Sequence, residues 1–210
     1  GRIRLGGNHG GDELVSNFGT LAVSGGASIE RLKASAGGGA FYGEKENPTR
    51  FICQPGGTLL GTGTLEYVNS TGSEKMKSLN LLNCGAIAPG EHEGKPGMLV
   101  LVDADVTFGN GAEKGAMPRG AGILRIDIAG TPAQQARFDK LQVSGTITFT
   151  AGAGNTLEII TPAGFTPSGR YRIATCTGTA GQFDVLRYNG KENVPYTVEY
   201  GNGGIDVIFK

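Results

Sequence analysis

Apolar and polar residues alternate in several short runs of this chain, and the alternation predicts β-strands. In residues 98–108, MLVLVDADVTF, every even position from Met98 to Phe108 is apolar, whereas Asp103 and Asp105 occupy odd positions. A period of two is the spacing of a strand that buries one face and exposes the other. We therefore predict one strand over residues 98–108, with its even positions inside the protein.

The same alternation recurs in two later segments. In residues 122–130, GILRIDIAG, apolar positions alternate with Arg125 and Asp127, and residues 138–149, FDKLQVSGTITF, alternate in the same way. The positions predicted to point inward are Leu124, Ile126, Ile128, Leu141, Val143, Ile147 and Phe149. Polar residues confined to one face are what a chain coiled around a thin core requires.

Glycine residues separate these short runs. The chain has 38 glycines among its 210 residues, where average usage of about 7% gives roughly 15. Strand-like runs recur roughly every 8 to 12 residues, and coils of about 20 to 25 residues can be laid in sequence along residues 1–193. We predict an all-β fold, a right-handed parallel β-helix (β-solenoid), with a β-sandwich or jelly roll as the alternative.

The C-terminal segment, residues 194–210, has a different pattern. Residues 194–200 (VPYTVEY) and 205–209 (IDVIF) alternate cleanly on either side of residues 201–204 (GNGG). Two alternating runs joined by a short glycine-rich turn predict an antiparallel hairpin. Such a hairpin would cover the last edge of a stack of coils, so we predict a C-terminal β-hairpin cap.

Four segments, taken in order, resemble parts of a known family. They are residues 56–68 (GGTLLGTGTLEYV), 86–108 (AIAPGEHEGKPGMLVLVDADVTF), 138–149 (FDKLQVSGTITF) and 164–184 (GFTPSGRYRIATCTGTAGQFD). They are similar to the C-terminal part of the β-helical passenger domains of bacterial autotransporters and to related secreted β-strand-repeat proteins. The resemblance implies a right-handed parallel β-helix without the translocator barrel, exported and displayed at the bacterial cell surface. It carries over no catalytic residue.

Charge and hydropathy narrow the choice of partners. Lys and Arg together number 19, as do Asp and Glu, so the formal net charge is zero. We expect no nucleic-acid partner, because no basic stripe is present. No apolar stretch approaches about 18 residues, so no membrane span is expected. Copies of a protein with zero net charge do not repel one another, which favours a homo-oligomer or polymer.

The three cysteines, Cys53, Cys84 and Cys176, allow two interpretations. Cys53 and Cys84 would lie one or two coils apart, so a disulfide between them is feasible in an oxidising compartment. In the alternative interpretation all three are buried thiols that act as small hydrophobic residues. Their spacing includes no C-x-x-C, and we expect no metal site.

The acidic residues and histidines offer little catalytic chemistry. Asp103 and Asp105, two apart on one predicted strand, would project from the same face, and paired carboxylates are what glycoside cleavage needs. Because no aromatic subsite or basic cluster accompanies them, we interpret them as solvated residues on the outward face. Three further acids, Asp127, Asp139 and Asp184, are interpreted in the same way, and His9 and His92 as residues of solvated loops.

These observations favour a non-catalytic extracellular structural or surface-display protein, without cofactor or metal. We expect polar loops at residues 43–50, 72–77 and 111–120 to bulge from the stack. Copies would join end to end into a filament or coat through the uncapped residues 1–5, GRIRL. The alternative function is a polysaccharide-binding adhesin, with surface glycan as its partner, or a β-helix polysaccharide lyase or hydrolase.

Overall fold

A computed structural model of the chain describes residues 2–5, 14–17, 19–23, 25–31, 50–69, 79–91, 95–110, 120–201 and 203–210. Over these residues the protein is all-β: it has strands β1 to β20, one 3-10 helix, η1 (Gln135–Arg137), and no α-helix. The described part of the chain contains no helix that is long and apolar enough to cross a membrane.

The strands form three sheets, which we call sheets A, B and C. Sheet A has eight strands in the spatial order β1 (Arg2–Leu5), β4 (Gly26–Arg31), β7 (Thr64–Asn69), β10 (Met98–Val102), β13 (Lys140–Val143), β16 (Gly169–Thr175), β20 (Gly204–Phe209) and β19 (Tyr196–Gly201). Sheet B has six: β2 (Leu14–Asn17), β5 (Arg50–Cys53), β8 (Leu79–Asn83), β11 (Ala104–Phe108), β14 (Thr146–Phe149) and β17 (Gly178–Ala180). Sheet C also has six: β3 (Thr20–Val23), β6 (Thr58–Gly61), β9 (Ala86–Pro89), β12 (Ile123–Asp127), β15 (Thr156–Ile160) and β18 (Val185–Tyr188).

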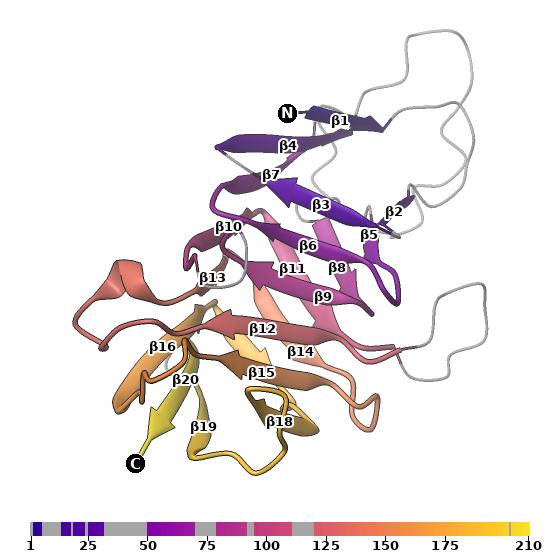
Figure 1. Cartoon of the computed structure of the whole chain (residues 1–210). Helices are drawn as coiled ribbons and strands as arrows, with labels where there is room; N and C mark the ends of the chain where they lie inside the picture. Colours follow the sequence, from indigo (N-terminus) through magenta and orange to yellow (C-terminus); the bar gives the residue numbers. More distant parts are fainter. Residues whose placement is uncertain are drawn as a thin grey trace, which may run out of the picture.

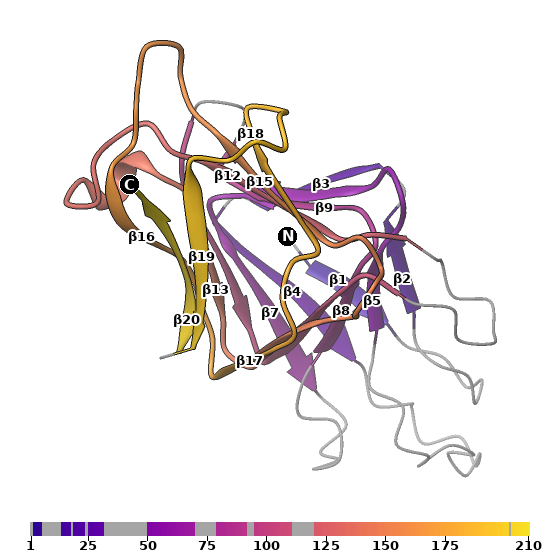
Figure 2. The same ribbon diagram turned by 90° about the horizontal axis from the view of Figure 1, so that it is seen from below.

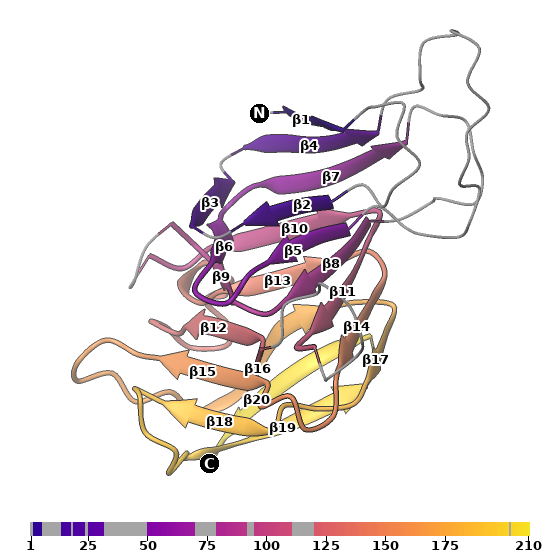
Figure 3. The same ribbon diagram turned by 90° about the vertical axis from the view of Figure 1, so that its right-hand side faces the viewer.

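The chain visits the three sheets in turn, so each strand pairs with the strand three places later. β9 pairs with β12, and β12 with β15, both in parallel. The same spacing and direction hold from β1 to β18, which run in order from one end of the stack to the other (Figures 1 and 3). Successive strands therefore lie in different sheets, an arrangement compatible with a β-solenoid.

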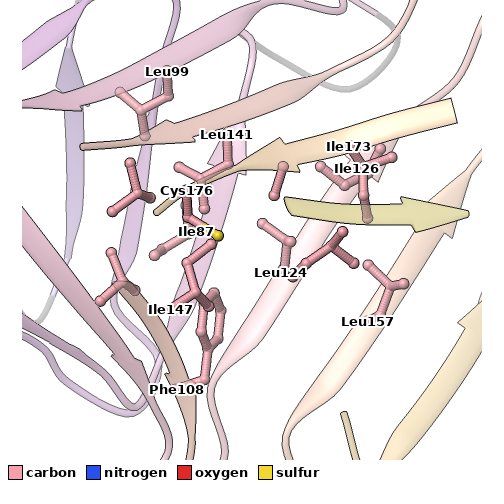
Figure 4. Close-up of a cluster of buried hydrophobic side chains, with 14 of the residues drawn as sticks. Ile87, Leu99, Phe108, Leu124, Ile126, Leu141, Ile147, Leu157, Ile173 and Cys176 are labelled. Atoms are coloured by element: carbon pink, nitrogen blue, oxygen red, sulfur yellow. The ribbon is translucent and has the colours of Figure 1, made fainter. Parts of the chain in front are cut away.

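The hydrophobic core lies between the three sheets (Figure 2). Inward side chains of neighbouring strands stack in columns along the strand pairings. The column of sheet C is Leu59, Ile87, Leu124, Leu157 and Leu186. The column of sheet B is Phe51, Leu81, Val106 and Ile147. Each fully buried side chain of this size contributes roughly 1.5–3 kcal/mol relative to exposure, and the columns meet in one cluster (Figure 4).

The predicted strand over residues 98–108 is wrong in part, because a corner divides it. β10 ends at Val102, β11 begins at Ala104, and Asp103 between them has a φ of 51°. In β10 the buried positions are Leu99 and Leu101, while Met98 is 45% exposed. The even positions point inward only from Ala104 onward. A corner of one residue inverts the alternation, because successive side chains of a strand point to opposite faces.

The inward positions predicted for the later segments are confirmed. Leu124, Ile126, Ile128, Leu141, Val143, Ile147 and Phe149 are all at most 4% exposed. The two residues Ser144 and Gly145 separate β13 from β14. Across a corner of two residues, odd-numbered positions stay on the same face. The alternation therefore predicted the correct face on both sides of this corner, but not on both sides of Asp103.

The final strands depart from the parallel pattern. β19 and β20 pair antiparallel, and β20 also pairs antiparallel with β16. Asp206 of β20 receives a hydrogen bond from Nη1 of Arg170 at 2.9 Å, and it also contacts Arg172. Tyr196 of β19 donates its hydroxyl to the carbonyl of Arg187 at 3.0 Å. Side chains thus reinforce the backbone pairing of these two strands with the rest of the stack.

Most of the predicted polar loops lie outside the described residues. This applies to residues 43–49, 72–77 and 111–119, and to His9 and His92. At the ends of these segments, Arg50 belongs to β5, and Gly120 forms an isolated antiparallel bridge with Asn110.

Candidate functional site

A hollow of about 150 Å³ lies on the outer side of sheet C. The residues that line it are Thr58, Leu60, Ala88, Pro89, Gly90, Glu91, Arg125, Asp127 and Asp139. They come from β6, β9, the two residues after β9, β12 and the segment that precedes β13. The middle strand, β9, contributes only the small side chains of Ala88 and Pro89 there. The larger Leu60 and Arg125 stand on either side, which leaves the depression.

Asp139 is the most buried polar residue of this hollow, with 2% exposure. Its Oδ1 accepts a hydrogen bond from the backbone N–H of Gly97 at 2.7 Å. Its Oδ2 accepts a second from the N–H of Asp127 at 2.8 Å. The side chain therefore ties the segment before β10 to the end of β12. It supplies acceptors to two backbone donors near the ends of their strands.

Burial raises the pKa of Asp139 to about 8. Removal from water disfavours the charged carboxylate, and the negative charge of neighbouring Asp127 acts in the same direction. The two backbone N–H groups oppose the shift, because hydrogen bonds to a carboxylate favour its charged form. Desolvation is the largest of these effects, so the carboxyl holds its proton far above the usual range.

This pKa predicts an unusual pH dependence of stability. In the unfolded chain Asp139 ionises near its ordinary pKa of about 3.9, whereas in the folded protein it ionises near pH 8. Between these values the folded state holds the proton that the unfolded state has released. The contribution of Asp139 to the free energy of unfolding therefore falls as pH rises, by up to about 1.4 kcal/mol per pH unit.

The measurement is urea unfolding of the wild type and of Asp139→Asn between pH 4 and pH 8. The variant loses one hydrogen-bond acceptor at every pH, which changes its unfolding free energy by a constant amount. It also lacks the pH-dependent contribution that Asp139 makes in the wild type. We expect the difference in unfolding free energy between the two proteins to change steadily across this range. Parallel pH profiles would show that Asp139 is ionised in the folded state.

Asp127 lies beside Asp139 and is 5% exposed. The interpretation of Asp127 and Asp139 as single solvated acids is therefore wrong. Asp127 does occupy an outward position of β12, as the alternation predicts. Residues of β9 and the segment around Asp139 lie next to Asp127. Both are distant from Asp127 in the sequence, so the residues around Asp127 gave no sign of its burial. Twelve positions separate the two carboxyls in the chain, and only the path of the chain between β12 and β13 brings them together.

Arg125, which lines the hollow, forms an ion pair with a carboxylate of the neighbouring strand. Nε of Arg125 lies 3.0 Å from Oε2 of Glu158, one strand away in sheet C. Arg125 and Glu158 are direct neighbours in the register of β12 and β15, on the outer face. The guanidinium is held along sheet C by Glu158, and it serves the sheet as a cross-strand pair.

Asp103 and Asp105 do not form the carboxylate pair that one continuous strand would give. Asp103 occupies the corner between β10 and β11, and Asp105 lies on β11 in sheet B. Oδ1 of Asp105 accepts hydrogen bonds from the N–H and the hydroxyl of Thr146, at 2.7 and 2.9 Å. Asp105 thus links the neighbouring strands β11 and β14 of sheet B.

Asp184 holds a loop in the same manner. Its carboxylate accepts hydrogen bonds from the N–H groups of Gly154 and Asn155, both at 2.9 Å. Asn155, fully buried, in turn accepts a hydrogen bond from the N–H of Gly122 at 3.0 Å and donates to the carbonyl of Thr150 at 2.8 Å. Asp184 is exposed, as its interpretation as a solvated acid predicts, and its carboxylate is also engaged with the backbone of this loop.

Sequence reasoning missed two buried asparagines. Asn83 and Asn155 are both 0% exposed. Nδ2 of Asn83 donates to the carbonyl of Ile123, one coil further on, at 3.1 Å, and its Oδ1 accepts from the N–H of Gly85 at 3.2 Å. Both asparagines come just before the first residues of a sheet C strand. An Asn within two residues of a glycine, shortly before a sheet C strand, is the signal that could have identified them.

All three cysteines are buried, and no disulfide joins them in this structure. Cys53 belongs to the main core, whereas Cys84 packs with Ile52 and Leu82 in a separate small cluster. The N–H of Cys84 donates to the carbonyl of Cys53 at 2.8 Å, so the two residues are on neighbouring rungs. Burial raises the pKa of Cys84 to about 11, with a smaller contribution from Cys53. A disulfide between them stays a prediction.

The hollow offers little to a catalytic reaction. Both oxygens of Asp139 are taken by backbone N–H groups, and both carboxyls are almost fully enclosed. Glycoside cleavage needs an acid and a base that reach opposite sides of the substrate bond. Within the described residues, no group of three or more His, Cys, Asp or Glu side chains is placed to hold a metal ion.

Comparisons of the chain with protein-family models, with curated proteins and with solved structures give no significant match.

Proposed function

We propose that this chain is a non-catalytic extracellular structural or surface-display protein whose copies associate end to end. The fold that serves this role is a right-handed parallel β-helix of six coils, with β19 and β20 as a cap at the C-terminal end. Pairing between strands three apart supports the coil. The right-handed sense of the β-helix is supported by a general rule, because connections between parallel strands of one sheet are right-handed in about 98% of cases.

One observation supports a role without catalysis: several polar side chains, both buried and exposed, are engaged with the backbone of other segments. Asp105, Asp139 and Asp184 each accept hydrogen bonds from the N–H groups of other segments, and Asn83 and Asn155 do the same work from inside. These contacts join one coil or corner to another. In an enzyme, such groups would instead converge on a space that a substrate can enter.

Support for the cap comes from the packing at the C-terminal end. Phe183, Tyr196 and Phe209 are each at most 5% exposed there. The hydroxyl of Tyr200, on β19, accepts a hydrogen bond from the N–H of Phe183 at 2.9 Å. Aromatic side chains of this size cover a large apolar area, so they are suited to closing the end of a core that would otherwise meet water.

The proposed location of the protein and its proposed end-to-end association are supported by different observations. Location outside the cell, at a bacterial surface, rests on the resemblance of the four segments to passenger domains. Association rests on the formal net charge of zero, which does not keep copies apart, and on the outermost strands of the three sheets among the described residues, which offer backbone groups for pairing. Whether association grows into a filament or coat, or stops at a pair, depends on which ends meet.

The experiment has two arms on the same purified protein. Sedimentation equilibrium over a wide concentration range should show a mass that rises above the 21.6 kDa of one chain. Incubation with a panel of bacterial surface polysaccharides should release no reducing ends. A single-chain mass at every concentration would contradict the association. Polysaccharide cleavage that Asp139→Asn abolishes would replace the structural role with an enzymatic one, and binding without cleavage would favour an adhesin.

A further inference from the structure

We propose that residues 128–138, which we call the arm, are latched to the stack by the carboxyl of Asp139 at acidic pH and released progressively as the pH rises. The arm lies between the end of β12 and the start of β13, and Figures 1 and 2 show it standing away from the three sheets. The inference does not depend on the association proposed above. Its basis is how the arm is fastened at its base and which charges surround that fastening.

The outer part of the arm is held mainly by its own backbone. Thr131 and residues 133–137 are exposed, and the short helix η1 buries none of its residues. The N–H of Gln134 donates to the carbonyl of Thr131 at 2.9 Å, and the N–H of Arg137 donates to the carbonyl of Gln134 at 2.8 Å. These bonds shape the tip of the arm, whereas its attachment to the stack depends on its base.

Asp139 fastens that base with both its backbone and its side chain. The N–H of Asp139 donates to the carbonyl of Asp127 at 2.9 Å, and Oδ2 of Asp139 accepts from the N–H of Asp127 at 2.8 Å. Its Oδ1 accepts from the N–H of Gly97 at 2.7 Å. One carboxyl therefore joins the two ends of the arm and also ties them to the segment before β10.

A second attachment of the arm does not titrate in the acidic or neutral range. The hydroxyl of Tyr171, on β16, donates to the carbonyl of Gly130 at 3.0 Å. The ring of Tyr171 also meets that of Phe138 edge-on, with 5.2 Å between their centroids. Burial raises the pKa of Tyr171 above its ordinary value, so the hydroxyl keeps its proton. Tyr171 thus offers a matched comparison with the latch.

Two further carboxyl groups and one cation line the hollow with Asp139. The carboxyl groups are those of Asp127, which is 5% exposed, and of Glu91, which is exposed. The cation is Arg125, whose Nε lies 3.0 Å from Oε2 of Glu158. Its charge is therefore shared with a carboxylate outside the hollow, and negative groups predominate around the latch.

Three more cations lie on the segments that Asp139 joins. Lys95, before β10, is exposed to water. Nη2 of Arg137 donates to the carbonyl of Ala129 at 3.2 Å, and Nζ of Lys140 lies over the ring of Phe138, 4.9 Å from its centroid. Ionisation of the enclosed latch would thus place a second negative charge close to Asp127. The loss of water and the like charge both oppose this ionisation.

The direction of the pH effect follows from the two states of the arm. In the closed arm the pKa of Asp139 is about 8, whereas in an open arm the carboxyl is in water, where its pKa is about 3.9. Between these values the closed arm holds a proton that the open arm has released. The open fraction therefore rises about tenfold per pH unit and levels off above the higher pKa. Opening the arm breaks only local contacts, so it requires less free energy than global unfolding.

Limited digestion with trypsin between about pH 6 and pH 9 tests the inference, with the cut after Arg137 identified by mass spectrometry. Phe138, on the other side of this bond, is 1% exposed, so the protease cannot bind the bond until the arm opens. Each rate is divided by the rate for an unstructured arginine peptide at the same pH. When reclosing is faster than cutting, this ratio follows the open fraction. We expect it to rise about tenfold from pH 6 to pH 7 and to change little above pH 8.

Two variants and one internal control separate the latch from other causes. Asp139→Asn cannot ionise, so its cut after Arg137 should not depend on pH. Tyr171→Phe removes the attachment that does not titrate, and it should raise the ratio roughly two- to tenfold at every pH without changing the slope. The control is the cut after Arg187 on β18, whose side chain is 43% exposed. Its ratio should be independent of pH.

A flat pH profile for the wild type would overturn the inference, and so would the wild-type slope in Asp139→Asn. Cuts after Arg137 and Arg187 that rise together would mean that the whole protein opens, which overturns the arm as a separate unit. If Asp139→Asn does not fold, the slopes of the wild type and of Tyr171→Phe decide, because the latch requires them to be equal and close to tenfold per pH unit.

Discussion

Replacing Leu99 by alanine is expected to lower the free energy of unfolding by roughly 2–5 kcal/mol, the range for large aliphatic residues truncated in a core. Leu99 is 0% exposed and stands next to Leu141 in the register of β10 and β13. The cavity left by the truncation would lie in the interior shared by the three sheets, where neighbouring coils constrain collapse on either side.

The matched control is its neighbour, Met98→Ala. Met98 is 45% exposed, so its truncation removes little buried surface and should change the unfolding free energy by about 0.5 kcal/mol or less. Urea unfolding followed by circular dichroism measures both variants. A larger loss for Met98→Ala than for Leu99→Ala would mean that β10 buries its even positions, as the unbroken alternation of residues 98–108 suggested.

Gly85→Ala is expected to destabilise the protein by roughly 3 kcal/mol, at the upper end of the usual cost of overpacking. A Cβ atom at Gly85 would lie 2.3 Å from the carbonyl oxygen of Gly57 and 2.4 Å from that of Gln54. Both obstacles are backbone atoms of the preceding coil, so no side chain can rotate away. The coils would have to separate at this corner.

Gly26→Ala serves as the comparison, because it makes the same chemical change in open space. A Cβ at Gly26 meets no atom within 4 Å, and its backbone is not in the left-handed region. The midpoint of urea unfolding should therefore stay close to that of the wild type for Gly26→Ala and fall for Gly85→Ala. Equal midpoints would show that the two coils are not in close contact at Gly85.

The raised pKa of Asp139 and the association of copies are independent of each other. Asp139 lies at the corner between β12 and β13, far along the chain from the N-terminal edge strands. Its predicted effect on stability therefore gives no support to association, and association gives none to it. Asp139→Asn is accordingly useful twice: it tests the raised pKa, and in the polysaccharide assay it tests the enclosed carboxyl pair of Asp127 and Asp139.

Sequence patterns gave the correct faces within one strand and across a corner of two residues, and failed across a corner of one residue. The alternation within residues 122–130 and 138–149 placed every inward residue correctly. In residues 98–108 the same rule failed at Asp103, because a corner of one residue inverts the faces. Nothing in the composition of MLVLVDADVTF marks that corner, since aspartate is also an ordinary outward residue of a half-buried strand.

Short strands with one apolar face, separated by glycine, could be predicted from the amino-acid sequence alone. Those features follow from local preferences, which depend on a few neighbouring residues. The contacts between distant residues could not be predicted in this way, and they became visible in the folded chain. The fold joined Asp127 to Asp139, Asp105 to Thr146 and Gly85 to the carbonyls of Gly57 and Gln54. Such contacts depend on how many residues each coil contains, because that number sets which positions of successive coils come into register.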